Sequence, residues 1–238
     1  MKFYHRKAQD RGVAENGWLH ARFTFSFADY YDPEHCGFHS LIVMNNDVIE
    51  PMGGFNMHPH DNAEIFTYVI SGKLEHKDSL GNGSTIHAGN FQYMSAGEGI
   101  THSEFNPSKK DKVELYQIWM LPNVRGGSPA YGEIQLEKIA LKNQMKILFS
   151  GDERKESSRI KQNAVFSFGR IDSDKQLEIK PDVNLSNVWI QIISGSCEVE
   201  NFSLRKADGL GIEKVEETLL VNCKETCEFF LFQLPDSQ

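Results

Sequence analysis

The chain lacks several features that would place it at a membrane or on nucleic acid. No run of apolar residues approaches the ~18 needed to cross a bilayer. Residues 1–6 are polar and lack the apolar core of a signal peptide. The formal charge is −8, with 25 Lys and Arg against 33 Asp and Glu, so no basic surplus is available to bind phosphates. We therefore expect a cytoplasmic protein that contacts neither membranes nor nucleic acids directly.

Cysteine is scarce and shows no metal-binding pattern. The four cysteines are Cys36, Cys197, Cys223 and Cys227, and no Cys-x-x-Cys pair is present. In a reducing compartment we expect free thiols rather than disulfides. Cys223 and Cys227 are close in sequence, but a thiolate site normally recruits a second pair of ligands, which is missing here.

Histidine is absent from the second half of the chain. Of the nine histidines, the last is His102, so the final 136 residues (238 − 102) contain none. Any histidine-rich site must therefore belong to the first half. The second half can contribute only carboxylates, thiols or packing.

Two short segments of the first half place metal-competent side chains two residues apart. His58 and His60 form one pair, and His102 and Glu104 form the other. Successive side chains of a β-strand point to opposite faces, so each pair shares one face. If the two strands face the inside of one barrel, three imidazoles and one carboxylate converge. That set suits Fe, Mn, Cu, Ni or Zn and does not suit Ca or Mg.

The rest of the chain predicts short antiparallel strands. Segments rich in β-branched and aromatic residues alternate with Gly-rich turns, which is typical of a sandwich or barrel. Phe23, Phe25 and Phe27 have a period of two and predict an aromatic strand within 18–31 whose face lies in the core. Residues 45–47 predict a turn.

The second half repeats the strand pattern of the first. Residues 125–129 predict a linker, and residues 190–195 echo residues 66–72 in composition. We therefore expect a second barrel that resembles the first but lacks its histidines. Residues 133–141 are the one segment that predicts a helix.

Three motifs closely resemble the pirin family, a branch of the cupin superfamily. They read Gly54-x3-His58-Pro59-His60-x3-Glu64, Leu74-Glu75-His76-Lys77-Asp78-Ser79-x-Gly81 and Ser95-Ala96-Gly97-x-Gly99-x2-His102-Ser103-Glu104. The resemblance covers the first 132 residues and extends more loosely through Trp189–Gln191 and Leu231–Pro235. Such spacing is far more specific than a lone His-x-His.

The resemblance implies an all-β bicupin with two antiparallel β-barrel (jelly-roll) domains, residues 1–132 and 133–238. It implies one divalent transition metal in the first barrel and none in the second. Iron(II) is the expected ion, with Mn, Cu, Ni, Co and Zn as alternatives. The ligands that the resemblance implies are His58, His60, His102 and Glu104.

The resemblance also implies a quercetin 2,3-dioxygenase-like activity. The substrates would be dioxygen and a flavonol such as quercetin, with release of carbon monoxide and with Glu104 as the catalytic general base. The alternative is a non-enzymatic iron- or redox-sensing regulator that acts through a protein partner. We expect a monomer, because a bicupin already packs two barrels together.

Three neighbouring residues need separate interpretation. Asp61 stands where the family commonly has Arg, which would place an anion instead of a cation near the mouth of the metal site. Glu64 shares a face with His58 and His60, and we interpret it as a structural or ligand-orienting residue. His76 is predicted to be hydrogen-bonded or exposed rather than a ligand.

Overall fold

The computed structural model describes residues 1–136, 141–152, 154 and 156–236. Within these residues the chain is built from β-strands and one short 3-10 helix, η1 (Ala8–Asp10), which confirms the predicted all-β class. No helix of the described part is long and apolar enough to cross a membrane. The predicted helix at 133–141 is wrong at its start, where residues 133–135 belong to a strand, and residues 137–140 lie outside the described residues.

The chain divides into two compact units, each a pair of sheets whose strands are antiparallel except for one parallel pair at an edge of the second unit. The first barrel comprises Gly12–Gly37 and Leu41–Leu136, and the second comprises Met1–Arg11, Phe38–Ser40 and Glu137–Gln238. This division differs from the expected boundary after residue 132, which falls inside a strand of the first barrel.

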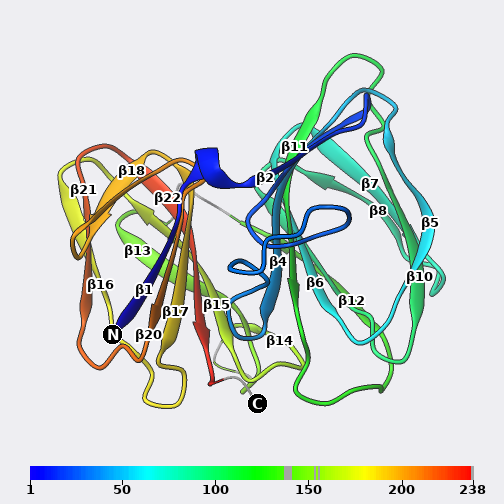
Figure 1. The fold of residues 1–238 in the computed structure, drawn as a ribbon. Helices are drawn as coiled ribbons and strands as arrows, with labels where there is room; N and C mark the ends of the chain where they lie inside the picture. The colour runs from blue at the N-terminus through cyan, green and yellow to red at the C-terminus, as the bar shows by residue number, and fades with distance from the viewer. Residues whose placement is uncertain (137–140, 153, 155, 237–238) are drawn as a thin grey trace. The chain divides into compact units, whose positions relative to one another are not determined.

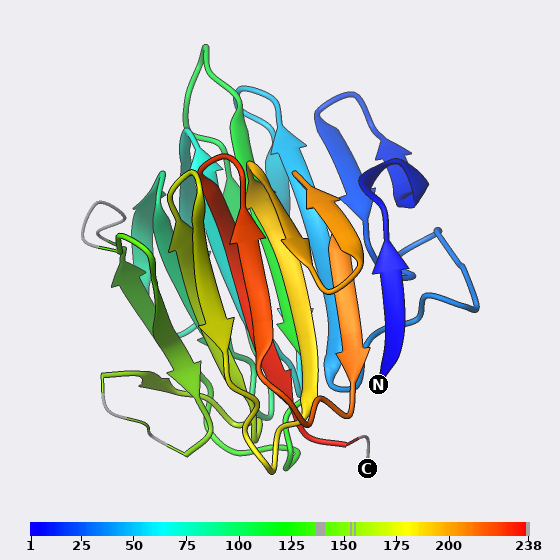
Figure 2. The same cartoon turned by 90° about the vertical axis from the view of Figure 1, so that its left-hand side faces the viewer.

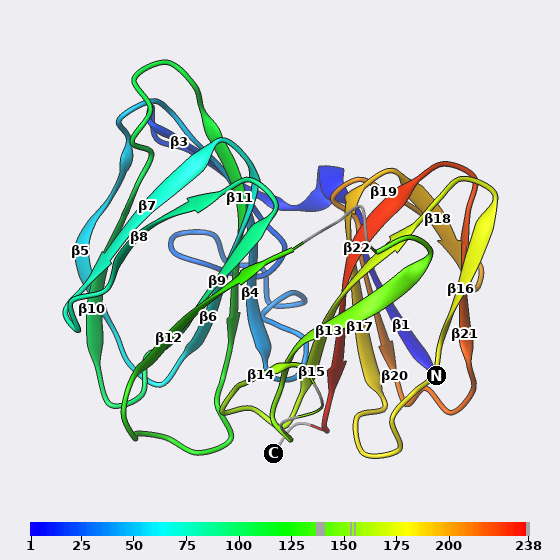
Figure 3. The same ribbon diagram turned by 180° about the vertical axis from the view of Figure 1, so that it is seen from behind.

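The first barrel consists of a seven-stranded and a four-stranded sheet, ordered β12-β9-β6-β11-β4-β3-β2 and β5-β10-β7-β8 (Figures 1 and 3). Its strands are β2 (Gly12–Glu15), β3 (Leu19–Phe23), β4 (Leu41–Ile49), β5 (Gly54–His60), β6 (Glu64–Ser71), β7 (Lys73–Asp78), β8 (Gly83–His87), β9 (Asn90–Ser95), β10 (Ile100–Phe105), β11 (Val113–Met120) and β12 (Ala130–Gln135).

The second barrel repeats this arrangement, with sheets ordered β1-β20-β17-β22-β15-β13-β14 and β16-β21-β18-β19. Figure 2 turns it toward the viewer, with β22 in red at the centre of its larger sheet. Its strands are β1 (Lys2–Arg6), β13 (Gln144–Ser150), β14 (Ser158–Arg159), β15 (Val165–Ile171), β16 (Lys175–Ile179), β17 (Asn187–Ser194), β18 (Ser196–Val199), β19 (Phe202–Arg205), β20 (Gly209–Glu213), β21 (Leu219–Cys223) and β22 (Cys227–Leu234).

The two sheets of the first barrel share an apolar core. Leu74 and Ile86 from the small sheet pack with Ala21, Ile49 and Val69 from the large one. In β10 buried and partly buried residues alternate, as expected for a strand with one face turned to the core. The alternation turns His102 and Glu104 inward, between the sheets.

Two predictions about local structure are wrong. The predicted turn at 45–47 lies inside β4, where Asn45 and Asp47 are buried. The aromatic strand predicted within 18–31 ends at Phe23. In β4 pairing with neighbours on both sides overrides the turn preference of Asn and Asp.

Gly54 is required for close pairing of β5 with β10. A Cβ atom there would lie 2.3 Å from the carbonyl oxygen of Glu104 and 2.6 Å from the Cα of Phe105. At Gly132, in β12 of the same barrel, an added Cβ would meet nothing within 4 Å.

We therefore expect Gly54→Ala to destabilise the protein by about 1–3 kcal/mol, because the added carbon forces β5 away from β10. Thermal unfolding of the two alanine variants measures the effect. Gly132→Ala should melt within about one degree of the parent, since a surface change away from packed features has little effect. Equal melting of both variants would contradict the tight β5–β10 contact.

Candidate metal centre

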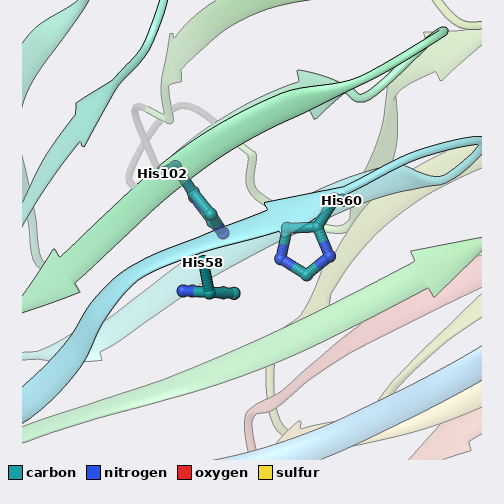
Figure 4. Close-up of side chains that lie close together, drawn as sticks. All are labelled: His58, His60 and His102. Atoms are coloured by element: carbon teal, nitrogen blue, oxygen red, sulfur yellow. The ribbon is translucent and has the colours of Figure 1, made fainter.

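The pairing of β5 with β10 brings three histidines together. His58 lies directly opposite His102 in the antiparallel register, and His60 pairs with Ile100. One ring nitrogen from each of His58, His60 and His102 lies within 4.8 Å of the other two. The ring centroids are 4.5 to 4.8 Å apart, and Figure 4 shows the three side chains lying close together beside the two paired strands.

Hydrogen bonds select which nitrogen of two of these rings is available. Nδ1 of His58 donates to the carbonyl oxygen of Asn56 at 2.7 Å, which leaves Nε2 with its lone pair. Nδ1 of His102 lies 3.4 Å from Nδ1 of His76, whereas Nε2 of His102 is buried without a hydrogen-bond partner. A ring held in this way presents one bare nitrogen to a cation.

Burial keeps the imidazoles of His60 and His102 neutral. Desolvation, with the neighbouring His58 as the next cause, lowers the pKa of His60 to about 4. Desolvation and the nearby histidines lower the pKa of His102 to about 3. Both rings are therefore uncharged at neutral pH, which is the state that binds metal ions.

Glu104 is buried against the opposite sheet. Its two carboxylate oxygens accept hydrogen bonds from Oγ1 of Thr67 at 3.2 Å and from Nε2 of Gln117 at 2.9 Å. Burial raises its pKa to about 7, although both hydrogen bonds act in the other direction. One carboxylate oxygen of Glu104 and one ring nitrogen each of His76 and His102 lie within 4.8 Å of one another. Glu104 does not belong to the cluster of His58, His60 and His102. His102 thus belongs to both clusters.

His76 is the part of the site that the sequence revealed least. It is fully buried, accepts a hydrogen bond at Nδ1 from Nε2 of Gln92 at 2.9 Å and donates from Nε2 to Asp78 at 3.3 Å. It is hydrogen-bonded as predicted, but its place in a His/Glu cluster follows from β7 pairing with β10, where Glu104 lies opposite His76. No sequence motif reports that cross-strand pairing.

Glu64 and Asp61 do not line the cavity at this site. The carboxylate of Glu64 is buried and accepts hydrogen bonds from Tyr93 at 2.5 Å and Ser95 at 2.6 Å, so its part is structural. Asp61 is exposed and accepts a hydrogen bond from Asn62. The charge of Asp61 nevertheless acts to raise the pKa of nearby His60.

The four predicted ligands line one cavity of about 190 Å³. Its remaining wall is apolar and aromatic at Phe27, Phe55, Ile65 and Trp119, and polar at three residues of the large sheet. Phe27 therefore faces the cavity, which corrects the prediction that the whole phenylalanine stripe belongs to the core. The polar residues are Asn45, Asp47 and Gln117.

This chemistry fits a divalent transition ion. An imidazole nitrogen is a borderline-soft donor and a carboxylate oxygen is a hard donor, and divalent transition ions accept both. Nε2 of His102 is buried without a hydrogen-bond partner among the described residues. Coordination of an ion would compensate for that missing hydrogen bond. Two antiparallel barrels with this donor set in the first define a bicupin with a candidate metal centre.

Comparison with known proteins supports the bicupin assignment. The chain matches the family model described as Pirin over residues 5–120 and the Quercetinase C-terminal cupin domain over residues 147–234. It is 40% identical over 232 residues to a quercetin 2,3-dioxygenase of Escherichia coli K12, covering 98% of each chain. A putative quercetin 2,3-dioxygenase of Pasteurella multocida is 39% identical, with 96% of this chain and 98% of the relative covered.

This chain belongs to the pirin family. Among solved structures, YhhW from Escherichia coli superposes with a TM-score of 0.94 at 39% identity, covering 100% of this chain and 99% of YhhW. The bacterial pirin YhhW in complex with nickel(II) gives a TM-score of 0.93 at 39% identity, with 99% and 100% covered.

The raised pKa of Glu104 predicts a stability effect in metal-free protein. The folded state holds the Glu104 proton up to about pH 7, because burial raises its pKa, whereas an unfolded carboxyl loses its proton near its ordinary pKa of 4.5. Stability from this group is thus present at low pH and lost as pH rises between these values. Glu104→Gln removes that loss, because the amide stays neutral.

We expect chelator-treated Glu104→Gln to be more stable than the parent at pH 8, by on the order of 2–3 kcal/mol. At pH 5 the two proteins should differ little. Denaturant unfolding at both pH values measures the difference in the free energy of unfolding between the two proteins. Both proteins contain the same histidines, so the pH dependence of the histidines cancels in that difference. A variant less stable than the parent at pH 8 would contradict the buried, uncompensated carboxylate.

Proposed function

We propose that this protein is a metal-dependent quercetin 2,3-dioxygenase that cleaves a flavonol with dioxygen. The observation that carries the proposal is that the clustered His58, His60 and His102 line one aromatic-walled cavity together with the buried Glu104. The near-full-length similarity to a quercetin 2,3-dioxygenase supports the same reaction.

In this proposal His58, His60 and His102 bind the ion through their available nitrogens, and Glu104 supplies the carboxylate. His76 is not a ligand in this proposal, because both of its nitrogens already have hydrogen-bond partners, and its ring packs against that of His102 at 5.3 Å between centroids. We propose iron(II) as the resident ion on the family resemblance, while the nickel(II) complex of YhhW supports a site that accepts more than one metal.

A bound divalent ion supplies Lewis acidity that lowers the pKa of a coordinating hydroxyl group. Glu104 is placed to take the proton that the flavonol hydroxyl releases, and its pKa near 7 suits proton exchange at neutral pH. Thr67 and Gln117 hold both oxygens of the carboxylate in place while the proton moves.

The apolar wall suits a planar ring. Trp119 packs edge-on against His60 at 4.8 Å between centroids and against Phe27 at 5.5 Å, so these rings support one another. Phe55 contacts His58 at 6.2 Å on the other side. An aromatic substrate in this cavity is shielded from water, which strengthens the polar contacts made to its oxygens.

A monomeric state and a cytoplasmic location stay predictions of the sequence.

Turnover by metal-loaded protein tests the function. Incubated with quercetin in air, protein loaded with iron(II) should bleach the flavonol absorbance and release carbon monoxide. His58→Ala should lower the rate at least about 100-fold, because the ion loses one of its anchoring imidazoles. Elemental analysis of the protein as purified identifies the resident metal.

His87→Ala is the matched control, because His87 is an exposed histidine of the same barrel outside the cavity. It should retain the parent rate. Absence of turnover with iron, manganese, copper, cobalt and nickel would overturn the enzymatic proposal and favour the regulatory alternative.

A further inference from the structure

Four polar side chains form a row across the core face of the seven-stranded sheet. The register places Gln92 of β9 opposite Thr67 of β6, Thr67 opposite Gln117 of β11, and Gln117 opposite Asn45 of β4. Gln117 is 9% exposed and the other three are 1% exposed. Polar residues are costly at such positions unless each one is hydrogen-bonded.

Three members of this row hold residues of the opposite sheet. Thr67 and Gln117 donate to the two carboxylate oxygens of Glu104. Gln92 donates to His76, which contacts His102. The row therefore supports the candidate metal centre, and each of these three side chains makes at least one hydrogen bond to the opposite sheet, although Oε1 of Gln92 is itself buried without a partner among the described residues.

Asn45 is the fourth member of the row. Its Oδ1 is buried and has no hydrogen-bond partner among the described residues, and its side chain lines the cavity beside Gln117. The adjacent Asn46 provides the contrast, because its amide donates to the carbonyl oxygen of Leu115 at 3.2 Å. A buried amide without a partner destabilises the fold, so its presence calls for a role other than packing.

We propose that Asn45 is a specificity-determining residue whose amide hydrogen-bonds an oxygen of the bound substrate. This inference rests on the proposed function and names a contact by which that site recognises its substrate. The unpaired atom is the amide oxygen, which accepts hydrogen bonds, so its partner would be a hydroxyl group of a hydroxylated aromatic ring system. Because Asn45 is next to Gln117, which holds Glu104, the oxygen it contacts lies on the part of the substrate nearest the reacting end.

Asn45→Leu tests this with a side chain of similar size that has no hydrogen-bonding group. Binding of quercetin and of unsubstituted flavone to anaerobic, metal-loaded protein is followed by quenching of tryptophan fluorescence. We expect the affinity for quercetin to fall about 3- to 10-fold, as for loss of one hydrogen bond. The affinity for flavone, which lacks the hydroxyl groups, should change less than about twofold, because its oxygens are fewer and its apolar contacts remain.

Thermal unfolding of the ligand-free protein separates this role from a structural one. Asn45→Leu should melt at or above the parent temperature, by up to about 2–4 °C, because it replaces an unpaired buried amide with an apolar group. Asn46→Leu, the same change on the same strand, should lower the melting temperature because it removes the bond to Leu115. A protein in which Asn45 were structural would show the loss at both positions.

Equal weakening of quercetin and flavone, or no weakening of either, would overturn the inference, as would a parent protein that binds neither compound. Asn45→Ser provides a second variant if Asn45→Leu fails to fold, and it should show the same selective loss. Failure of the proposed function is distinct, since a parent that binds quercetin without consuming it in air loses the dioxygenase assignment and keeps the binding contrast at Asn45.

Discussion

The pairing of β5 with β10 is the contact on which the candidate site depends. It sets His58 directly opposite His102 and fixes His60 one step along the same face. The register is irregular between His102 and Glu104, which separates the carboxylate from the β5 histidines and lets it lie against the large sheet. Gly54 allows the two backbones to approach this closely.

The two barrels show how one scaffold can carry or omit this chemistry. The β16–β21 pair of the second barrel occupies the place in its small sheet that β5–β10 occupies in the first. There Leu177 lies opposite Val221, and both belong to or pack against an apolar core. The strand order is the same, so side-chain identity on two strands decides which barrel can gather donors.

The sequence predicts much of this arrangement because its strongest signals are local. The period-two pairs His58/His60 and His102/Glu104 predict the two strands and the inward face without knowledge of their partners. Non-local features could not be predicted in the same way. The joining of β1 to β20 and the approach of His76 to Glu104 depend on cross-strand pairing over long sequence separations. Asn45 has turn propensity by itself and is strand only because β3 and β11 flank it.

We propose that this pairing lets three imidazoles and one carboxylate bind a single ion. X-ray absorption spectroscopy of the metal-loaded protein tests it most directly, because imidazole rings give characteristic multiple-scattering features and sulfur ligands lengthen the first shell. The account predicts a first shell of nitrogen and oxygen that contains three imidazoles, reduced to two in His58→Ala. A shell with sulfur, or one whose imidazole count is unchanged in that variant, would contradict it.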